Sequence, residues 1–120
     1  MAENKLIDLS FELAKEIVNI VDNTKVPKSS YMLDQLGRAG TSVGANIHEA
    51  QYAHSKADFI AKLEIALKEA NETSYWLQLL VESGRISKDE FQSAEKLCGT
   101  IRRLLIASCS TAKANQNNKK

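Results

Sequence analysis

The sequence predicts an all-α protein, folded as an antiparallel up-down-up-down four-helix bundle. Apolar residues recur at alternating three- and four-residue spacing in four segments of about 19–28 residues, the period of an amphipathic helix. Short polar turns separate these segments, so successive helices are expected to lie antiparallel. The 120 residues include one proline and no alternating β-branched run of strand length. We expect one domain over residues 1–114 and a disordered polar tail over 115–120, which has no apolar residue to bury.

The first predicted helix runs from Asn4 to Asp22 and has an unusually wide apolar surface. Its main stripe consists of Leu6, Leu9, Leu13, Ile17 and Ile20. Beside that stripe lie Ile7, Phe11, Val18 and Val21. Together they cover an arc of roughly 200°, about twice the width typical of a surface helix. We therefore expect this helix to contact a second subunit as well as its own core.

The second predicted helix begins at Ser29 or Ser30, ends near Ala53, and contains three glycines. Each glycine inside a helix costs about 0.5–1 kcal/mol relative to alanine. Its apolar stripe consists of Leu33, Leu36, Gly40, Val43, Ile47 and Ala50, and its small polar row includes Gln35, Ser42, Asn46 and Glu49. We interpret it as a helix that neighbouring helices approach closely.

The third predicted helix starts after the N-cap Ser55, stops at Ser83-Gly84, and is apolar on two sides. The core stripe is Ile60, Leu63, Leu67, Ala70, Ser74, Leu77 and Val81. An almost opposite stripe is Ile65, Glu69, Glu72, Trp76 and Leu79. Large apolar groups facing away from the core indicate a subunit interface. The predicted interface residues are Ile7, Phe11, Val18, Ile65, Trp76 and Leu79.

The fourth predicted helix starts at the capping box Ser87-Lys88-Asp89-Glu90. Its core stripe is Phe91, Ala94, Cys98, Ile101, Leu105, Ser108 and Ala112. Cys98 and Cys109 are separated by about 16 Å of helical rise, too far for a disulfide. Two free thiols indicate a reducing compartment. Since no membrane span or signal peptide is recognisable, we expect a cytoplasmic protein without membrane contact.

Charge is distributed unevenly along the chain. Residues 1–95 contain 10 basic and 15 acidic side chains, whereas residues 96–120 contain six basic side chains and no acid. Such asymmetry is typical either of a nucleic-acid contact or of a solvated helix face, and with a net charge of +1 both readings stay open. The candidate nucleic-acid-binding residues are Arg38, Lys96, Arg102, Arg103 and Lys113.

No catalytic or metal-binding pattern is recognisable, so we expect neither an enzyme nor a cofactor. A di-metal site in a four-helix bundle needs Glu-x-x-His pairs, but His48 and His54 have no glutamate three residues before them. Carboxylates such as Glu49, Glu69 and Glu72 can act as an acid/base set, but no nucleophile accompanies them. We favour a polar network between helices or subunits, formed by Asn46, Glu49, Glu69 and Glu72 with Arg38 or Lys68 as partners.

The second predicted helix also carries a family resemblance. Residues 35–39 (QLGRA), 42–43 (SV) and 46–50 (NIHEA) resemble the central signature of small bacterial four-helix-bundle proteins, first found encoded in intervening sequences of 23S rRNA genes. The resemblance continues through residues 55–60, 68–73, 75–77 and 84–87. It implies a ring-shaped homopentamer. The chain is also similar to the accessory variability determinant proteins of diversity-generating retroelements, which are more basic and associate with nucleic acid and a reverse transcriptase.

These observations lead to two hypotheses about function. The first is a non-enzymatic homo-oligomeric scaffold, expected from the resemblance to be a pentamer and to associate with RNA or another nucleic acid. The second is an adaptor that docks a partner enzyme without binding nucleic acid. The sequence indicates self-association more strongly than it indicates either ligand.

Overall fold

The computed structural model describes residues 2–118, with side chains described for residues 5–116, and within this range the chain forms four α-helices. They are α1 (Ala2–Asn23), α2 (Ser30–Ala50), α3 (Lys56–Glu82) and α4 (Lys88–Asn118). No strand interrupts them in the described chain. The predicted all-α class is therefore confirmed.

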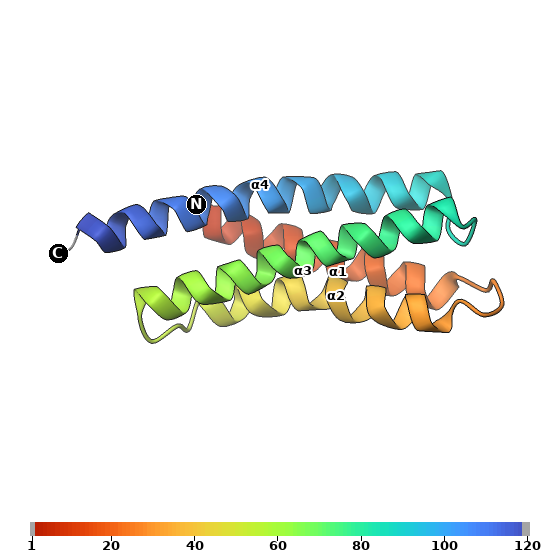
Figure 1. Ribbon diagram of the computed structural model, residues 1–120, viewed down its shortest axis with the longest axis horizontal. Helices are drawn as coiled ribbons and strands as arrows, with labels where there is room; N and C mark the ends of the chain where they lie inside the picture. The colour runs from red at the N-terminus through yellow and green to blue at the C-terminus, as the bar shows by residue number, and fades with distance from the viewer. Residues whose placement is uncertain (1, 119–120) are drawn as a thin grey trace.

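Each helix packs against two neighbours, which gives the bundle a square cross-section. The contacting pairs are α1 with α2, α2 with α3, α3 with α4, and α1 with α4, whereas the diagonal pairs do not touch in the described part of the chain. Successive helices run in opposite directions along a rod of 55 × 21 × 19 Å (Figure 1). This is the predicted up-down-up-down arrangement.

The starts of α3 and α4 follow the cap signals in the sequence, whereas the Ser29 side chain makes no capping hydrogen bond at the start of α2. The Ser55 hydroxyl accepts a hydrogen bond from the backbone N–H of Asp58 at 3.0 Å. In the Ser87-Glu90 capping box both hydrogen bonds form, each at 3.0 Å. The backbone N–H of Ser87 donates to Glu90 Oε1, and the backbone N–H of Glu90 donates to Ser87 Oγ. Gly84 ends the turn after α3 with φ +76°, a left-handed conformation that glycine adopts without a Cβ clash.

Two helix ends differ from the prediction. Helix α2 ends at Ala50 rather than Ala53, and the next three backbone N–H groups bond to carbonyls three residues back, which tightens the chain into a turn. Helix α4 continues to Asn118, four residues into the segment predicted as a tail. Because no glycine or proline follows Ala112 to stop it, each added residue needs only one further hydrogen bond. Residues 119–120 lie outside the described residues.

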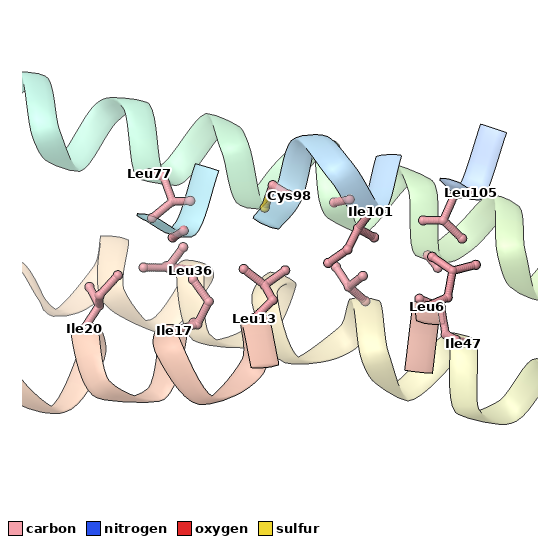
Figure 2. Close-up of a cluster of buried hydrophobic side chains, with 14 of the residues drawn as sticks. Leu6, Leu13, Ile17, Ile20, Leu36, Ile47, Leu77, Cys98, Ile101 and Leu105 are labelled. Carbon is pink, nitrogen blue, oxygen red and sulfur yellow. The ribbon is translucent and has the colours of Figure 1, made fainter. Parts of the chain in front are cut away.

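The core is an aliphatic column to which all four helices contribute (Figure 2). The predicted stripe of α2 is buried at all six positions. On α3 the prediction is partly wrong, since Ala66, Thr73 and Leu80 are buried where Leu67, Ser74 and Val81 were expected. Helix α3 carries apolar side chains on several sides, so its periodicity alone did not define the inward direction. The three predicted residues are half-buried beside the core.

The glycines of α2 lie where α1 comes closest. A Cβ built on Gly40 would lie 2.7 Å from Cγ1 and 2.8 Å from Cγ2 of Ile17, and one on Gly44 would lie 3.3 Å from the Ser10 hydroxyl. Normal carbon contacts lie near 3.5–4.0 Å, so Gly40 in particular permits this approach. The expectation that neighbours approach α2 closely is confirmed on its α1 side.

Candidate functional site

A cluster of charged side chains joins α2 to α3 on the surface of the bundle. Arg38 reaches from α2 across to α3, where its Nη1 donates to Glu69 Oε1 at 3.2 Å and its Nη2 donates to Glu72 Oε2. Its Nε donates to the Gln35 side chain at 3.3 Å. This is the predicted partnership of Glu69 and Glu72 with Arg38, formed between two helices of one subunit. Arg38, one of the candidate nucleic-acid-binding residues, is thus already paired with two carboxylates.

The same cluster accounts for much of the position of Trp76. Its indole Nε1–H donates to Glu72 Oε2 at 3.1 Å, and the ring is half-buried against the core. The Arg38 guanidinium, followed by this indole N–H, holds the pKa of the Glu72 carboxyl below its ordinary value of 4.5. Trp76 was predicted to face outward at a subunit interface. Within one subunit it already has a hydrogen-bond partner and packing.

The other two members of the predicted polar network lie elsewhere. Asn46 donates to the backbone carbonyl of Ser42 at 2.9 Å, one turn earlier on its own helix. Glu49 is exposed and, among the described residues, has no side-chain hydrogen bond or ion pair. The structure thus brings Glu69 and Glu72 together but leaves Asn46 and Glu49 outside their cluster.

A second cluster, which the sequence analysis missed, joins α3 to α4. Ser74 donates from its hydroxyl to Glu95 Oε1 at 2.7 Å and accepts a hydrogen bond from Arg102 Nη1. Arg102 Nη2 also pairs with Glu95 Oε2 at 3.3 Å. Glu95 and Arg102 are seven residues apart, which places them on one face of α4, and that spacing was the available signal. Arg102 is therefore a half-buried bridge between helices.

The five candidate nucleic-acid-binding residues divide into two groups. Arg38, Arg102 and Lys113 each pair with a carboxylate, the last with Glu64 at 2.8 Å. Lys96 and Arg103 are exposed on α4 and have no carboxylate partner within the described part of the chain. Arg103 donates to the Thr100 hydroxyl at 3.2 Å. Since these two cations are seven residues apart, they project from the same side of the helix.

An apolar groove runs between α1 and α2. It has a volume of about 870 Å³ and is lined by Ile7, Phe11, Ala14, Thr41, Gly44 and Ala45, together with polar and charged residues of both helices. Phe11 is 66% exposed and Val18 is 46% exposed, whereas Ile7 packs partly against the core. All three were predicted as interface residues. In a single subunit, the side chains of Phe11 and Val18 expose large apolar surfaces to solvent.

A second apolar surface lies on the outer side of α3. Ile65, Tyr75 and Leu79 are 41%, 60% and 38% exposed, respectively. Ile65 and Leu79 belong to the predicted interface set, and Tyr75 adds to it. Tyr75 packs edge-on against Trp76, with ring centroids 5.0 Å apart.

The histidines and cysteines form no reactive constellation. No group of three or more His, Cys, Asp or Glu side chains among the described residues is placed to hold a metal ion. Cys98 and Cys109 are both buried and free. Burial raises the pKa of the Cys98 thiol to about 12 and also raises the pKa of the Cys109 thiol. Both are therefore protonated near neutral pH, which makes them poor nucleophiles.

Comparison with known proteins agrees with this architecture. The sequence model of the family described as "23S rRNA-intervening sequence protein" matches residues 2–107. The chain belongs to this family. One similar solved structure is a protein of unknown function from the S23 ribosomal protein family of Bacteroides thetaiotaomicron. It is 43% identical, the match covers 92% of this chain and 99% of that one, and the TM-score is 0.84. No curated protein matches the chain.

The family assignment confirms the resemblance drawn from residues 35–50. The TM-score shows that the similar solved structure has the same fold, and the function of that protein is unknown. Among the described residues, no helix combines the length and the apolar character needed to cross a membrane.

Proposed function

We propose that this family member is a non-enzymatic, self-associating scaffold, a homopentamer that binds RNA or another nucleic acid through the outer face of α4. The proposal of a nucleic-acid ligand rests on two residues, Lys96 and Arg103. Both are exposed, lie on one side of α4, and have no carboxylate partner in the part of the chain that is described. Their free charges suit phosphate groups, which bind cations irrespective of sequence.

Self-association is supported by the exposed apolar residues. Phe11 and Val18 on α1, and Ile65 and Leu79 on α3, are each more than one-third exposed. Covering such groups removes apolar area from water at about 25 cal/mol per Å². Repetition of α4 around an oligomer would multiply the positive surface beyond what one chain with a net charge of +1 provides. Buried, reduced thiols fit a cytoplasmic location, which we include in the proposal.

The test for nucleic acid compares one double variant with a matched control. A gel-shift titration with structured RNA over a salt series should give a steep linear fall of log affinity with log salt. Lys96→Glu with Arg103→Glu should weaken binding and lower the slope by about one for each phosphate group that the protein no longer neutralises. The control is Lys25→Glu with Lys56→Glu, which reverses two exposed lysines outside α4. An equal effect of both double variants would refute α4 as the binding face.

The assembly is tested separately. Light scattering after size exclusion should give five times the monomer mass of 13.3 kDa at micromolar concentration. A monomer would refute the scaffold proposal. An oligomer that shifts no RNA even at low salt would instead favour the adaptor function, in which the assembled surface docks a partner protein.

A further inference from the structure

We propose that the groove between α1 and α2 is a docking site for a basic amphipathic helix of a partner protein. This site is separate from the α4 cations to which the nucleic-acid ligand is assigned, so it adds a second binding activity to the scaffold. Three features of the groove define the occupant: its shape, its apolar lining and the charges beside it.

The shape of the groove suits a helix. It lies between two packed helices and follows α1 from Ile7 to Lys15, which corresponds to about 12 Å of helical rise, or two turns. On the α2 side it is lined by Thr41, Gly44 and Ala45, which are small and let another backbone come close. Grooves of this form take the apolar stripe of an amphipathic helix, whose anchors are spaced three and four residues apart.

The apolar lining offers a large anchor for such a stripe. Phe11 is 66% exposed, and aromatic rings contribute strongly to binding when a partner covers them. Lys15 lies over this ring, with its Nζ 5.7 Å from the ring centroid, and forms no ion pair in the described chain. The lysine that lines the groove is therefore placed at the aromatic ring and not at a carboxylate.

Carboxylates from both helices flank the apolar lining. Asp8 and Glu12 come from α1 and Glu49 comes from α2, and all three are exposed. Within residues 5–116 none of them forms an ion pair. Three negative charges and the positive charge of Lys15 give the described lining a net charge of −2, with His48 counted as neutral. A helix with lysines or arginines on both sides of its apolar stripe complements this arrangement.

Other occupants match the groove less well. Unpaired carboxylates repel the phosphate groups of a nucleic acid and the anionic lipids of a membrane surface. In a second copy of the chain, the outer side of α3 carries Glu72 as well as Lys68, and α4 exposes one large apolar side chain, Ile106. Since α1 and α3 are diagonal in the bundle, an occupied groove leaves Ile65 and Leu79 available for the self-association proposed above.

Two synthetic peptides of about 18 residues, long enough to form a helix, probe the groove of the full-length protein. Both have leucines spaced three and four residues apart, flanked by lysines in one peptide and by glutamates in the other. Fluorescence anisotropy of the labelled peptides gives the dissociation constants. The lysine peptide should bind, and the glutamate peptide should have a dissociation constant about tenfold or more higher.

A pair of charge reversals tests the carboxylates. Glu12→Lys with Glu49→Lys should raise the dissociation constant of the lysine peptide about tenfold or more and lower that of the glutamate peptide. The matched control, Asp22→Lys with Asp34→Lys, reverses two exposed carboxylates of the same helices outside the groove. It should change either dissociation constant by less than about twofold, because salt screens charges that are distant from the peptide.

A second pair of variants tests the apolar anchor. Phe11→Asp should raise the dissociation constant of the lysine peptide about tenfold or more. Ile106→Asp is the control, since Ile106 is 54% exposed on α4, outside the groove, and this variant should bind the peptide as wild type does.

Several results would overturn the inference. One is equal weakening by the two charge-reversed double variants, and another is a glutamate peptide that binds wild type as tightly as the lysine peptide does. A wild-type oligomer that excludes the lysine peptide and that Phe11→Asp dissociates would show that a second copy covers the groove. Circular dichroism shows whether each variant is folded, and if Phe11→Asp is not, the exchanged peptide preference of the Glu12 and Glu49 double variant decides. RNA binding is measured separately, so failure of this inference leaves the nucleic-acid proposal standing.

Discussion

Gly40 and Gly37 lie three residues apart on α2, yet replacing each with alanine is expected to have opposite effects. At Gly40 the new methyl group would lie 2.7 and 2.8 Å from the two γ carbons of Ile17, which is fully buried. At Gly37 the nearest atom would be Cγ2 of Val21 at 3.7 Å, an ordinary contact. A comparison of the two alanine substitutions therefore separates the cost of close packing from the gain in helix propensity.

The size of two opposing free-energy terms determines whether each substitution stabilises or destabilises the fold. Alanine in place of glycine stabilises a helix interior by about 0.5–1 kcal/mol. Overpacking a core costs about 1–3 kcal/mol, and Ile17 cannot turn aside easily because β-branched side chains are restricted at χ1. Gly40→Ala should therefore lower the free energy of unfolding by about 1–2 kcal/mol, and Gly37→Ala should raise it by about 0.5–1 kcal/mol.

Thermal unfolding followed by circular dichroism measures both changes. For a chain of this size 1 kcal/mol corresponds to about 4 °C, so Gly40→Ala should lower Tm by about 4–8 °C and Gly37→Ala should raise it by about 2–4 °C. Protein concentration must be held constant, since the proposed self-association would make Tm concentration-dependent.

A double-mutant cycle identifies the cause. Ile17→Ala alone leaves a cavity and should cost about 2–5 kcal/mol, but combined with Gly40→Ala it should cost less, because the new methyl group occupies part of that space. The packing explanation is wrong if Gly40→Ala raises Tm, or if the two substitutions add without coupling.

Three further predictions follow from single side chains. Lys28→Gly should raise the free energy of unfolding by about 0.5–1 kcal/mol in urea titrations, because Lys28 has φ +64°, a left-handed conformation that is unfavourable for residues with a Cβ. Glu72→Gln should reduce the loss of stability in acid, measured as urea midpoints from pH 6 to pH 3. The native pKa of Glu72 lies below its ordinary 4.5, so the carboxylate stabilises the fold above that value, and this contribution is lost as pH falls through the native pKa. Cys98 should react with a thiol reagent at pH 8 only as fast as the protein unfolds, since it is buried with a pKa of about 12.

The results that would contradict these three predictions are equally simple. A lower urea midpoint for Lys28→Gly would show that its backbone conformation carries no strain. An acid profile of Glu72→Gln that parallels wild type would show that the Arg38 ion pair is too solvated to contribute. Labelling of native protein at the rate of an unfolded peptide would show that Cys98 is accessible.

The sequence predicted the fold well where one face of a helix differed clearly from the rest. Helix α2 has a single aliphatic stripe from Leu33 to Ala50, and all six predicted positions are buried. On α3 the predicted side faces the core, but the helix is turned slightly from the predicted stripe, so that Ala66, Thr73 and Leu80 are buried in place of their sequence neighbours Leu67, Ser74 and Val81. The exact rotation depends on the neighbouring helices, and periodicity carries no information about them.

The ionic contacts were harder to predict because they join distant parts of the chain. Arg38 pairs with Glu69 and Glu72, 31 and 34 residues away, and was predicted both as a partner of these carboxylates and as a candidate nucleic-acid-binding residue. The Ser74–Glu95–Arg102 contacts, which join α3 to α4, were not predicted. The local capping boxes, by contrast, were recognisable from four consecutive residues. Charge in the sequence indicates a candidate surface, but only the fold shows which cations are already paired.

An even number of antiparallel helices returns the chain to the end of the rod from which it started. Helix α1 begins and α4 ends at the same end of the bundle, whereas the α1–α2 and α3–α4 connections lie at the other (Figure 1). The two ends of the bundle therefore differ from each other. A ring of such subunits with its axis along the rods would have two chemically different rims, one with the chain ends and the α2–α3 connection and one with the other two connections (Figure 1). Fluorophores attached near the start of α1 and near the end of α4 would then lie on the same rim, and tandem copies could be joined along it by short linkers.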